Sequence, residues 1–226
     1  MKNIAVIVGA GKGKRMGSKD KAFLDFNRKP VLLYSITPFE LSPLVDEIIL
    51  VVGNNKVKAA ENLIKKYRVK KVTGVITGGK ERQDSVHNAL KIIKNANLVL
   101  VHDVARPFID TRLIKTCVIA AKKFKAAIPA VLSRDTVKRG NSFVEKTIPR
   151  NNLWLIQTPQ VFDFSILKKA YDTAIKKKFC GTDDASLVER LGYKIKIVQG
   201  YSDNIKITFS SDLIIAEALL KKRERE

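Results

Sequence analysis

The residues best suited to chemistry lie near the start of the chain, in a glycine-rich loop that carries several cations. The loop reads Gly9-Ala10-Gly11-Lys12-Gly13-Lys14-Arg15-Met16-Gly17, and Lys21 follows shortly after it. Glycines let a backbone approach a polyphosphate closely, and lysine and arginine side chains bind its charges. The pattern predicts a loop that binds nucleotide phosphates, although a basic turn after a first strand would also fit these residues taken alone.

Two familiar phosphate-binding loops do not match this segment. The dinucleotide pattern G-x-G-x-x-G fails because Lys14 or Met16 stands where the last glycine is required. The Walker pattern fails because no glycine pair five residues apart precedes Lys-Ser or Lys-Thr. The loop is therefore a different kind of phosphate site.

A carboxylate stands at the end of a second apolar run. Asp103 follows the strand-like stretch 98–101, which places it at a carboxyl-terminal strand edge, where ligands bind in open α/β sheets. This position favours a Mg²⁺ ligand. The alternative is a carboxylate that caps the turn through Ala105-Arg106-Pro107.

The elements that must hold these residues alternate along the chain. Apolar strand-like runs alternate with helical spacing, which predicts a layered α/β/α fold with a mostly parallel, Rossmann-like sheet in a single domain over residues 1–226. The central strands are expected at 4–8, 48–52, 98–101 and 127–132, and helices at 57–67, 86–93, 113–124 after an Asp110 N-cap, 166–174 and 213–220. Cys117 falls on the apolar side of its helix and is interpreted as a core residue.

The segment 134–157 breaks this alternation. Two short β-like stretches, 136–138 and 143–147, flank the turn Arg139-Gly140-Asn141-Ser142 and predict a projecting hairpin. A lone hairpin is marginally stable in water, so we expect this arm to pack on a partner.

Bulk properties exclude several classes of protein. Two separated cysteines and two histidines give no structural zinc pattern and no disulfide framework. Neither a signal-peptide core nor a membrane span of roughly 20 apolar residues is present, so a cytoplasmic protein is expected. The net charge of +21 would suit a nucleic-acid-binding protein, but the cations are dispersed and aromatics make up only 7%, which makes nucleic acid an unlikely partner.

Six segments stand out along the chain: the opening loop with Lys21, 78–86 (GGKERQDSV), 101–107 (VHDVARP), 134–139 (RDTVKR), 157–160 (QTPQ) and 203–208 (DNIKIT). Together they resemble the 2-C-methyl-D-erythritol 4-phosphate cytidylyltransferase family, and the first also resembles sugar-phosphate nucleotidyltransferases in general. The segments appear in the family's order and span essentially the whole chain. Val8, Gly9 and Ala22 depart from the residues usual in the family, and none of these departures removes a charged candidate.

The resemblance implies a nucleotidyltransferase sheet and a Mg²⁺-dependent reaction in which the acceptor phosphate attacks the α-phosphate of CTP in line, giving the 4-diphosphocytidyl product and pyrophosphate. It assigns charge stabilisation on the triphosphate to Arg15 and Lys21 and the metal to Asp103. The nucleotide would be bound by Ala10, Gly11, Gly13, Gly79, Lys80, Ser85 and Arg106. From the residues alone, Asp84 or Ser85 could instead cap the following helix, and Arg82 could be a nucleotide contact or an ion-pair partner.

For the acceptor phosphate, the resemblance points to Thr136 and Arg150, which the arm would contribute to the neighbouring subunit of a homodimer formed through 134–157. It adds Asp203 and Lys206, the latter also as a catalytic cation, and Thr158 as a weaker candidate. Flanked by two isoleucines, Lys206 could otherwise be an outward residue of an edge strand.

Two other functions fit parts of this sequence. A ribitol-5-phosphate cytidylyltransferase would share the motifs and differ in its polyol. A basic nucleic-acid-binding protein on a nucleotidyltransferase-like fold would bind DNA or RNA in a salt-sensitive manner and would not need Arg15.

Overall fold

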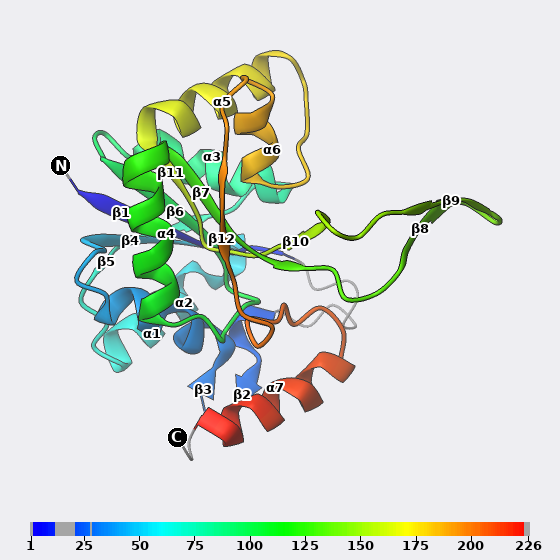
Figure 1. Ribbon diagram of the computed structural model, residues 1–226. Helices are drawn as coiled ribbons and strands as arrows, with labels where there is room; N and C mark the ends of the chain where they lie inside the picture. Colours follow the sequence, from blue (N-terminus) through cyan, green and yellow to red (C-terminus); the bar gives the residue numbers. More distant parts are fainter. Residues whose placement is uncertain (1, 12–20, 28, 224–226) are drawn as a thin grey trace.

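The protein is built around a twisted eight-stranded β-sheet (Figure 1). The computed structural model describes residues 2–11, 21–27 and 29–223. The strand order is β10-β7-β11-β6-β1-β4-β5, with β12 paired to β7. The strands of this sheet are β1 (Asn3–Gly9), β4 (Glu47–Val52), β5 (Val72–Thr77), β6 (Leu98–Asp103), β7 (Ala126–Leu132), β10 (Trp154–Ile156), β11 (Gln160–Asp163) and β12 (Lys196–Gln199).

The order of the strands reverses around β1. β1 pairs in parallel with β4 on one side and with β6 on the other, while β11 runs antiparallel between β6 and β7. Such a reversal opens a crevice at the carboxyl ends of the two diverging strands, where open α/β sheets bind ligands. The loops after β1 and β6 therefore form the expected site.

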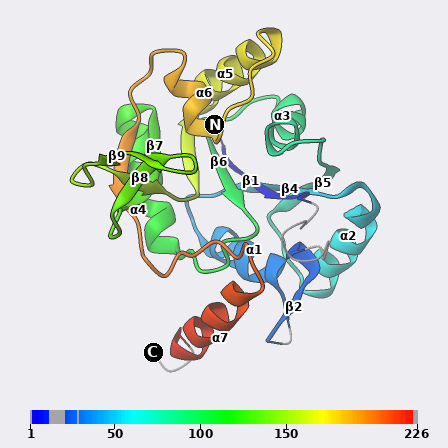
Figure 2. The ribbon, with the colours of Figure 1, turned by 90° about the vertical axis from the view of Figure 1, so that its right-hand side faces the viewer.

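Helices cover both faces of the sheet, which Figure 2 shows nearly edge-on. One face packs against α1, α2 and α4 and the other against α3, α5 and α6, while α7 lies beyond the sheet and adds Ala216 and Leu220 to the apolar core of the first face. The helices are α1 (Val31–Leu41), α2 (Val57–Lys66), α3 (Arg82–Ile92), α4 (Thr111–Phe124), α5 (Phe164–Lys176), α6 (Asp184–Glu189) and α7 (Ser211–Arg223), with short 3-10 turns η2 (Lys21–Phe23) and η3 (Asn54–Lys56) and the two-residue strands β2 (Asp25–Phe26) and β3 (Lys29–Pro30).

Acidic side chains fix where several helices begin. Asp110 accepts a hydrogen bond from the backbone N–H of Leu113 at 2.8 Å and starts α4, as its sequence position predicts. Asp163 and Asp183 cap α5 and α6 in the same way. Because a capped helix start has a defined position, the first residues of α6 are held where the site needs them.

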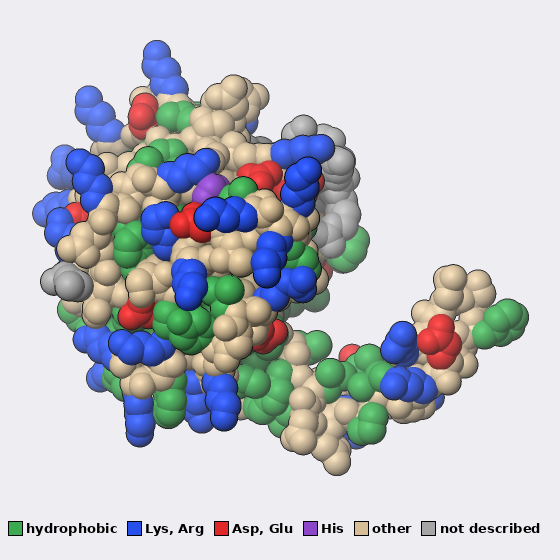
Figure 3. All heavy atoms as spheres, turned by 90° about the horizontal axis from the view of Figure 1, so that it is seen from above, with side chains coloured by type: hydrophobic (Ala, Val, Ile, Leu, Met, Phe, Trp, Pro, Cys, Tyr) green, Lys and Arg blue, Asp and Glu red, His purple; other side chains and the backbone are tan. Residues whose placement is uncertain are grey.

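A two-stranded hairpin, β8 (Val137–Gly140) and β9 (Val144–Ile148), projects far from the body of the protein (Figure 3). Its tip carries Phe143, whose exposed fraction is 88%, and Val144, at 65%. Lysines and arginines are dispersed over the face that Figure 3 shows rather than gathered into one patch. The arm thus presents apolar side chains to its surroundings, with no covering from its own chain.

The fold class predicted from the sequence is confirmed: the layers, the mostly parallel sheet and the hairpin arm are all present. Cys117 is fully buried, as predicted. The hairpin strands begin one residue later than predicted, at Val137 and Val144. Within the described residues, no helix has the length and apolar character needed to span a bilayer.

Candidate active site

Two loops meet at the crevice beside β1. Val8 pairs with Asp103 across β1 and β6, and the backbone N–H of Val104 donates to the carbonyl of Val8 at 3.0 Å. A Cβ built on Gly9 would lie 2.9 Å from the Val104 side chain, so glycine permits this close approach. The beginning of the glycine-rich loop is thereby fixed next to Asp103, which lies at the end of β6 as the sequence predicts.

The Asp103 carboxylate is clamped between two cations. Arg82 donates from Nε to Oδ1 at 2.8 Å, and Lys206 donates from Nζ to Oδ2 at 2.6 Å. The Asp103 side chain is only 10% exposed, whereas that of Lys206 is 42% exposed. The structure thus brings together Asp103 and Lys206, two of the residues predicted for the site, and places a partly exposed ammonium at its solvent side.

Arg82 is held in turn by a second, fully buried carboxylate. Its Nη1 and Nη2 donate to Oδ1 and Oδ2 of Asp184 at 3.0 and 2.8 Å, a planar two-bond contact that lysine could not make. The hydroxyl of Tyr171 on α5 also donates to Asp184. The ion-pair alternative for Arg82 is therefore the one that the structure shows.

The charges of this cluster stabilise one another. Burial raises the pKa of the Asp103 carboxyl, but the charges of Arg82 and Lys206 outweigh it and hold that pKa far below its usual range. Burial lowers the pKa of the Arg82 guanidinium, and the charges of Asp184 and Asp103 more than reverse this effect. Asp103 is accordingly ionised and Arg82 protonated at neutral pH.

A neutral hydrogen-bond chain supports the other side of Asp103. The backbone N–H of Asp103 donates to Thr158 Oγ1 at 3.2 Å, and that hydroxyl lies 2.9 Å from His102 Nδ1. His102 Nε2 lies 3.1 Å from the carbonyl oxygen of Arg106, which can only accept, so the ring proton belongs on Nε2 and Nδ1 accepts from Thr158. Burial lowers the pKa of His102 to about 4, which keeps the ring neutral.

Arg106, predicted to fix either the nucleotide or its own loop, binds protein carbonyls. Nη1 donates to the carbonyl of Asn204 at 2.7 Å and Nη2 to that of Ile156 at 3.1 Å. Asn204 is fully buried, and its amide nitrogen donates to the carbonyl of Thr158 at 3.0 Å. Arg106 thus ties the loop after β6 to the segment that carries Lys206. That segment contains no strand, so Lys206 is not the outward residue of an edge strand.

The turn before α3 is closed by its own side chains. Ser85 is 2% exposed, and its hydroxyl accepts from the N–H of Gly79 at 3.0 Å and donates to the carbonyl of Glu81 at 3.1 Å. Asp84 accepts from the N–H of Glu81 at 3.0 Å, which completes a capping box. Lys80 is exposed beside this turn. The capping alternative is therefore correct for Asp84, while Ser85 shapes the turn that presents Gly79.

The remaining predicted residues lie elsewhere. Gly13 and Arg15 lie outside the described residues, and of Lys21 only the backbone, in η2, is described. Thr136 and Arg150 are exposed residues that flank the hairpin strands β8 and β9, and Arg150 Nη1 donates to the carbonyl of Arg134.

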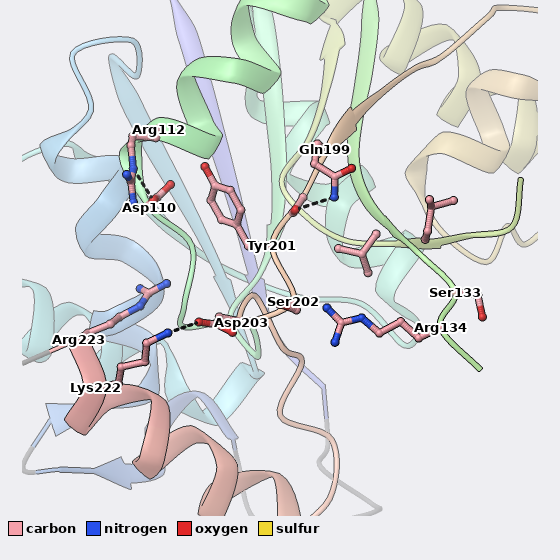
Figure 4. Close-up of a pocket in the computed structure, with 13 residues that line it drawn as sticks. Asp110, Arg112, Ser133, Arg134, Gln199, Tyr201, Ser202, Asp203, Lys222 and Arg223 are labelled. Atoms are coloured by element: carbon pink, nitrogen blue, oxygen red, sulfur yellow. Dashed lines mark hydrogen bonds and ion pairs between the residues drawn. The ribbon is translucent and has the colours of Figure 1, made fainter. Parts of the chain in front are cut away.

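Asp203 is expected with the acceptor-binding residues, and that role stays a prediction. Its carboxylate lies 3.7 Å from Nζ of Lys222 and lines a pocket beside α7 (Figure 4). Neither Asp103 nor Lys206 lines this pocket.

Asp184 and Tyr171 are the residues that sequence reasoning missed. Asp184 follows a good N-cap, Asp183, and therefore reads as an ordinary acidic residue in the first turn of a helix. Its partner Arg82 lies 102 residues away, a pairing that no local pattern reveals.

Comparison with known proteins adds independent information. The sequence model of the family described as 2-C-methyl-D-erythritol 4-phosphate cytidylyltransferase matches residues 3–222. Proteins of that name from Geobacillus kaustophilus and Clostridium acetobutylicum are each 42% identical over 224 residues, covering 98% and 97% of this chain and 98% of each relative.

Solved structures agree with this comparison. A 4-diphosphocytidyl-2C-methyl-D-erythritol synthase from Anaerococcus prevotii superposes with a TM-score of 0.86 at 32% identity, covering 97% of this chain and 96% of that one. The 2-C-methyl-D-erythritol 4-phosphate cytidylyltransferase of Francisella tularensis gives 0.83 at 32% identity, with coverages of 97% and 100%.

We predict that Asp184→Asn lowers the free energy of unfolding by about 2 to 3 kcal/mol. The substitution keeps the shape of the side chain, but it removes a buried charge and turns an N–H group toward Arg82. The loss of stability stays below that for a fully buried ion pair because the Arg82 side chain is partly exposed. Urea denaturation measures the change. The control is Asp172→Asn, an exposed ion-pair partner of Lys168 that should cost less than about 1 kcal/mol. Equal losses of stability in the two variants would show that the Asp184–Arg82 contact stabilises the fold no more than an exposed ion pair does.

We also predict that stability falls as the pH is lowered from about 7 to about 4. The unfolded chain takes up the His102 proton near the ordinary pKa of 6.5, but the folded chain only near 4, so protonation in this window favours unfolding by up to about 3 kcal/mol. His87, whose pKa burial also lowers, acts in the same direction. Urea denaturation across this range measures how the free energy of unfolding depends on pH. This dependence should be steep in His87→Gln and much shallower in the double variant that also carries His102→Gln. Identical slopes would contradict the assignment.

Proposed function

The chain belongs to the 2-C-methyl-D-erythritol 4-phosphate cytidylyltransferase family and joins CTP to 2-C-methyl-D-erythritol 4-phosphate in isoprenoid synthesis, and we propose that it does so in the crevice between β1 and β6. The observation that carries this location is the register of Val8 against Asp103. That register places the beginning of the glycine-rich loop beside a carboxylate that binds both Arg82 and Lys206.

The reaction needs positioning and charge rather than a nucleophilic side chain. An oxygen of the acceptor phosphate forms a bond to the α-phosphorus of CTP, and the bond from that phosphorus to the bridging oxygen of the leaving pyrophosphate breaks. Two anions must be held together during this exchange. At an effective dielectric constant of about 20, each contact between unlike charges near 4 Å contributes roughly 4 kcal/mol before desolvation, so a few cations suffice.

Distinct residues serve the two substrates in this proposal. Arg15 and Lys21 bind the triphosphate, together with backbone groups of the glycine-rich loop at Ala10, Gly11 and Gly13 and the turn at Gly79, Lys80 and Ser85. Lys206 lies at the junction and stabilises the charge on the reacting phosphates. Its partly exposed ammonium, on a flexible side chain, supports this role.

The residues present fit a Mg²⁺ ion carried in with the nucleotide. No cluster of three or more His, Cys, Asp or Glu side chains suited to a metal occurs among the described residues, so a cage made only of protein ligands is not formed there. Mg²⁺ commonly binds one carboxylate together with substrate phosphates and waters, and the ionised Asp103 offers that carboxylate. When bound, the ion would neutralise charge that develops on the phosphates.

We further propose a homodimer in which the arm completes the partner's site. The exposed apolar tip of the hairpin supports this arrangement, and so does the exposure of Thr136 and Arg150 beside an arm that projects from the body of the protein (Figure 1). The two cysteines are free, with Cys117 buried and Cys180 exposed, which supports a cytoplasmic enzyme in a reducing environment.

We predict that Arg15→Ala and Lys206→Ala each lower kcat at least about 100-fold, because each removes a cation from charge that builds up in the transition state. Both variants should keep a wild-type circular dichroism spectrum. Lys115→Ala, which changes an exposed lysine on α4, is the matched control and should keep full activity. Normal turnover in Lys206→Ala would remove that residue from the mechanism.

The dimer is tested by mixing two inactive variants. If Arg150 acts in the partner's site, a dimer of one Arg150→Ala chain and one Lys206→Ala chain has one intact site and one doubly defective site. Refolding an equimolar mixture should then restore about a quarter of wild-type activity, because half of the dimers are mixed and half of their sites are intact. No recovery would mean that the two residues act within one chain.

Substrate choice is measured as pyrophosphate release. CTP with 2-C-methyl-D-erythritol 4-phosphate should give release, whereas UTP, ATP or ribitol 5-phosphate in place of the matching substrate should give little. A chelator should abolish the reaction and added Mg²⁺ should restore it. Release that persists in the chelator would reject the metal requirement but leave the substrate assignment intact.

A further inference from the structure

A second pocket, with a volume of about 820 Å³, lies outside the Asp103 cluster. It is formed by the carboxyl ends of β7 and β12, the loop before α4 and the last turn of α7 (Figure 4). None of the residues that surround Asp103 lines it. Its size is within the range of sites that bind small organic molecules.

Four cations from three parts of the chain line this pocket, against two carboxylates. Arg112 pairs with Asp110 at 3.1 Å, and Lys222 lies 3.7 Å from Asp203. The other two cations, Arg134 and Arg223, form no ion pair with any carboxylate among the described residues. The lining therefore carries a surplus of two positive charges and suits a ligand with about two negative charges.

The two surplus arginines lie on opposite sides of the pocket (Figure 4). Arg223 donates from Nη2 to the carbonyl of Phe108 at 2.6 Å, and its guanidinium lies 5.3 Å above the ring of Phe108, so its position is fixed. Arg134 enters from the opposite wall, and its guanidinium extends toward Ser202 and Asp203 (Figure 4). Two guanidinium groups facing one cavity are well suited to a phosphate group.

The rest of the lining suits an organic body attached to that phosphate. Val131 and Leu132 provide an apolar wall at the end of β7, and the ring of Tyr201 faces the cavity beside Arg112. A bare inorganic ion would leave this apolar surface in contact with water, whereas a short carbon chain would cover it.

One segment separates this pocket from the active site. Residues 199–203 line the pocket, the carbonyl of Asn204 binds Arg106, and Lys206 binds Asp103. An anion that draws Lys222 away from Asp203 would free the Asp203 carboxylate within this segment. A change at Asp203 is therefore only three residues from the ammonium at the reacting phosphates.

We propose that this pocket binds a small phosphorylated organic compound and that its occupancy changes turnover through the segment 199–206. By thermodynamic linkage, a ligand that shifts the segment changes the affinity for CTP by some factor, and CTP changes the affinity for that ligand by the same factor.

The test uses the full chain and its single tryptophan. Trp154 pairs with Leu132 in the β10–β7 ladder and so reports on the wall of the pocket. Propyl phosphate is titrated with CTP at saturation, which fills the nucleotide site, and inorganic phosphate is titrated in parallel. Arg134→Gln is the test variant, since it removes the charge and leaves the carbonyl that Arg150 binds. Arg68→Gln removes an exposed arginine after α2, outside the pocket.

We expect saturable binding of propyl phosphate in the presence of CTP, with inorganic phosphate binding more weakly. Arg134→Gln should weaken binding about tenfold or more, because a charge-assisted contact is lost, and Arg68→Gln should leave it within about twofold. Propyl phosphate should also alter the rate of pyrophosphate release in the wild type and in Arg68→Gln but not in Arg134→Gln.

Four results would overturn the proposal or its coupling step. Complete displacement of propyl phosphate by CTP or by 2-C-methyl-D-erythritol 4-phosphate would place it in the active site. Equal effects of the two substitutions would show that it binds through general surface charge. Absence of binding at millimolar concentration would reject the pocket as a ligand site. Binding that leaves turnover unchanged in every variant would reject the coupling through the segment 199–206.

Discussion

The site depends on one buried, ionised carboxylate that two cations from distant parts of the sequence hold in place. Asp103 lies at the end of β6, and its partners Arg82 and Lys206 lie 21 residues before it and 103 residues after it. A charge removed from water at such a position is costly unless it is paired and hydrogen-bonded, so each partner must be placed accurately by the fold. Those two contacts bind the start of α3 and the segment before α7 to the central strand.

The two sides of Asp103 are supported by networks of different kinds. On one side the network is charged: Arg82 forks onto Asp184, which brings α6 and, through Tyr171, α5 to the crevice. On the other side it is neutral, and it runs from the Asp103 N–H through Thr158 and His102 to the carbonyl of Arg106. The charged network sets the protonation of the carboxylate, while the neutral one sets the position of its backbone.

Local patterns predict most of this arrangement, and the long-range pairings are what they miss. The strand ends, the Asp110 cap and the position of Asp103 follow from apolar periodicity and cap chemistry within a few residues. The role of Asp184 does not, because its side chain is interpretable only once α6 is packed against Arg82. Ser85 shows the same limit: its residue type permits a ligand contact or a turn contact, and only the structure shows its hydroxyl bonded to Gly79 and Glu81.

The charge balance of the cluster separates attraction of the substrates from their positioning. Arg82 and Lys206 carry two positive charges and Asp103 and Asp184 two negative ones, so the four side chains together attract no anion at long range. Attraction must come from the surplus that gives the chain a net charge of +21, including the lysines and arginine of the glycine-rich loop. In the mechanism proposed above, the cluster would act only at contact: a phosphate in the crevice would compete with Asp103 for the partly exposed ammonium of Lys206, while Arg82, bonded to Asp184, would keep the carboxylate in position.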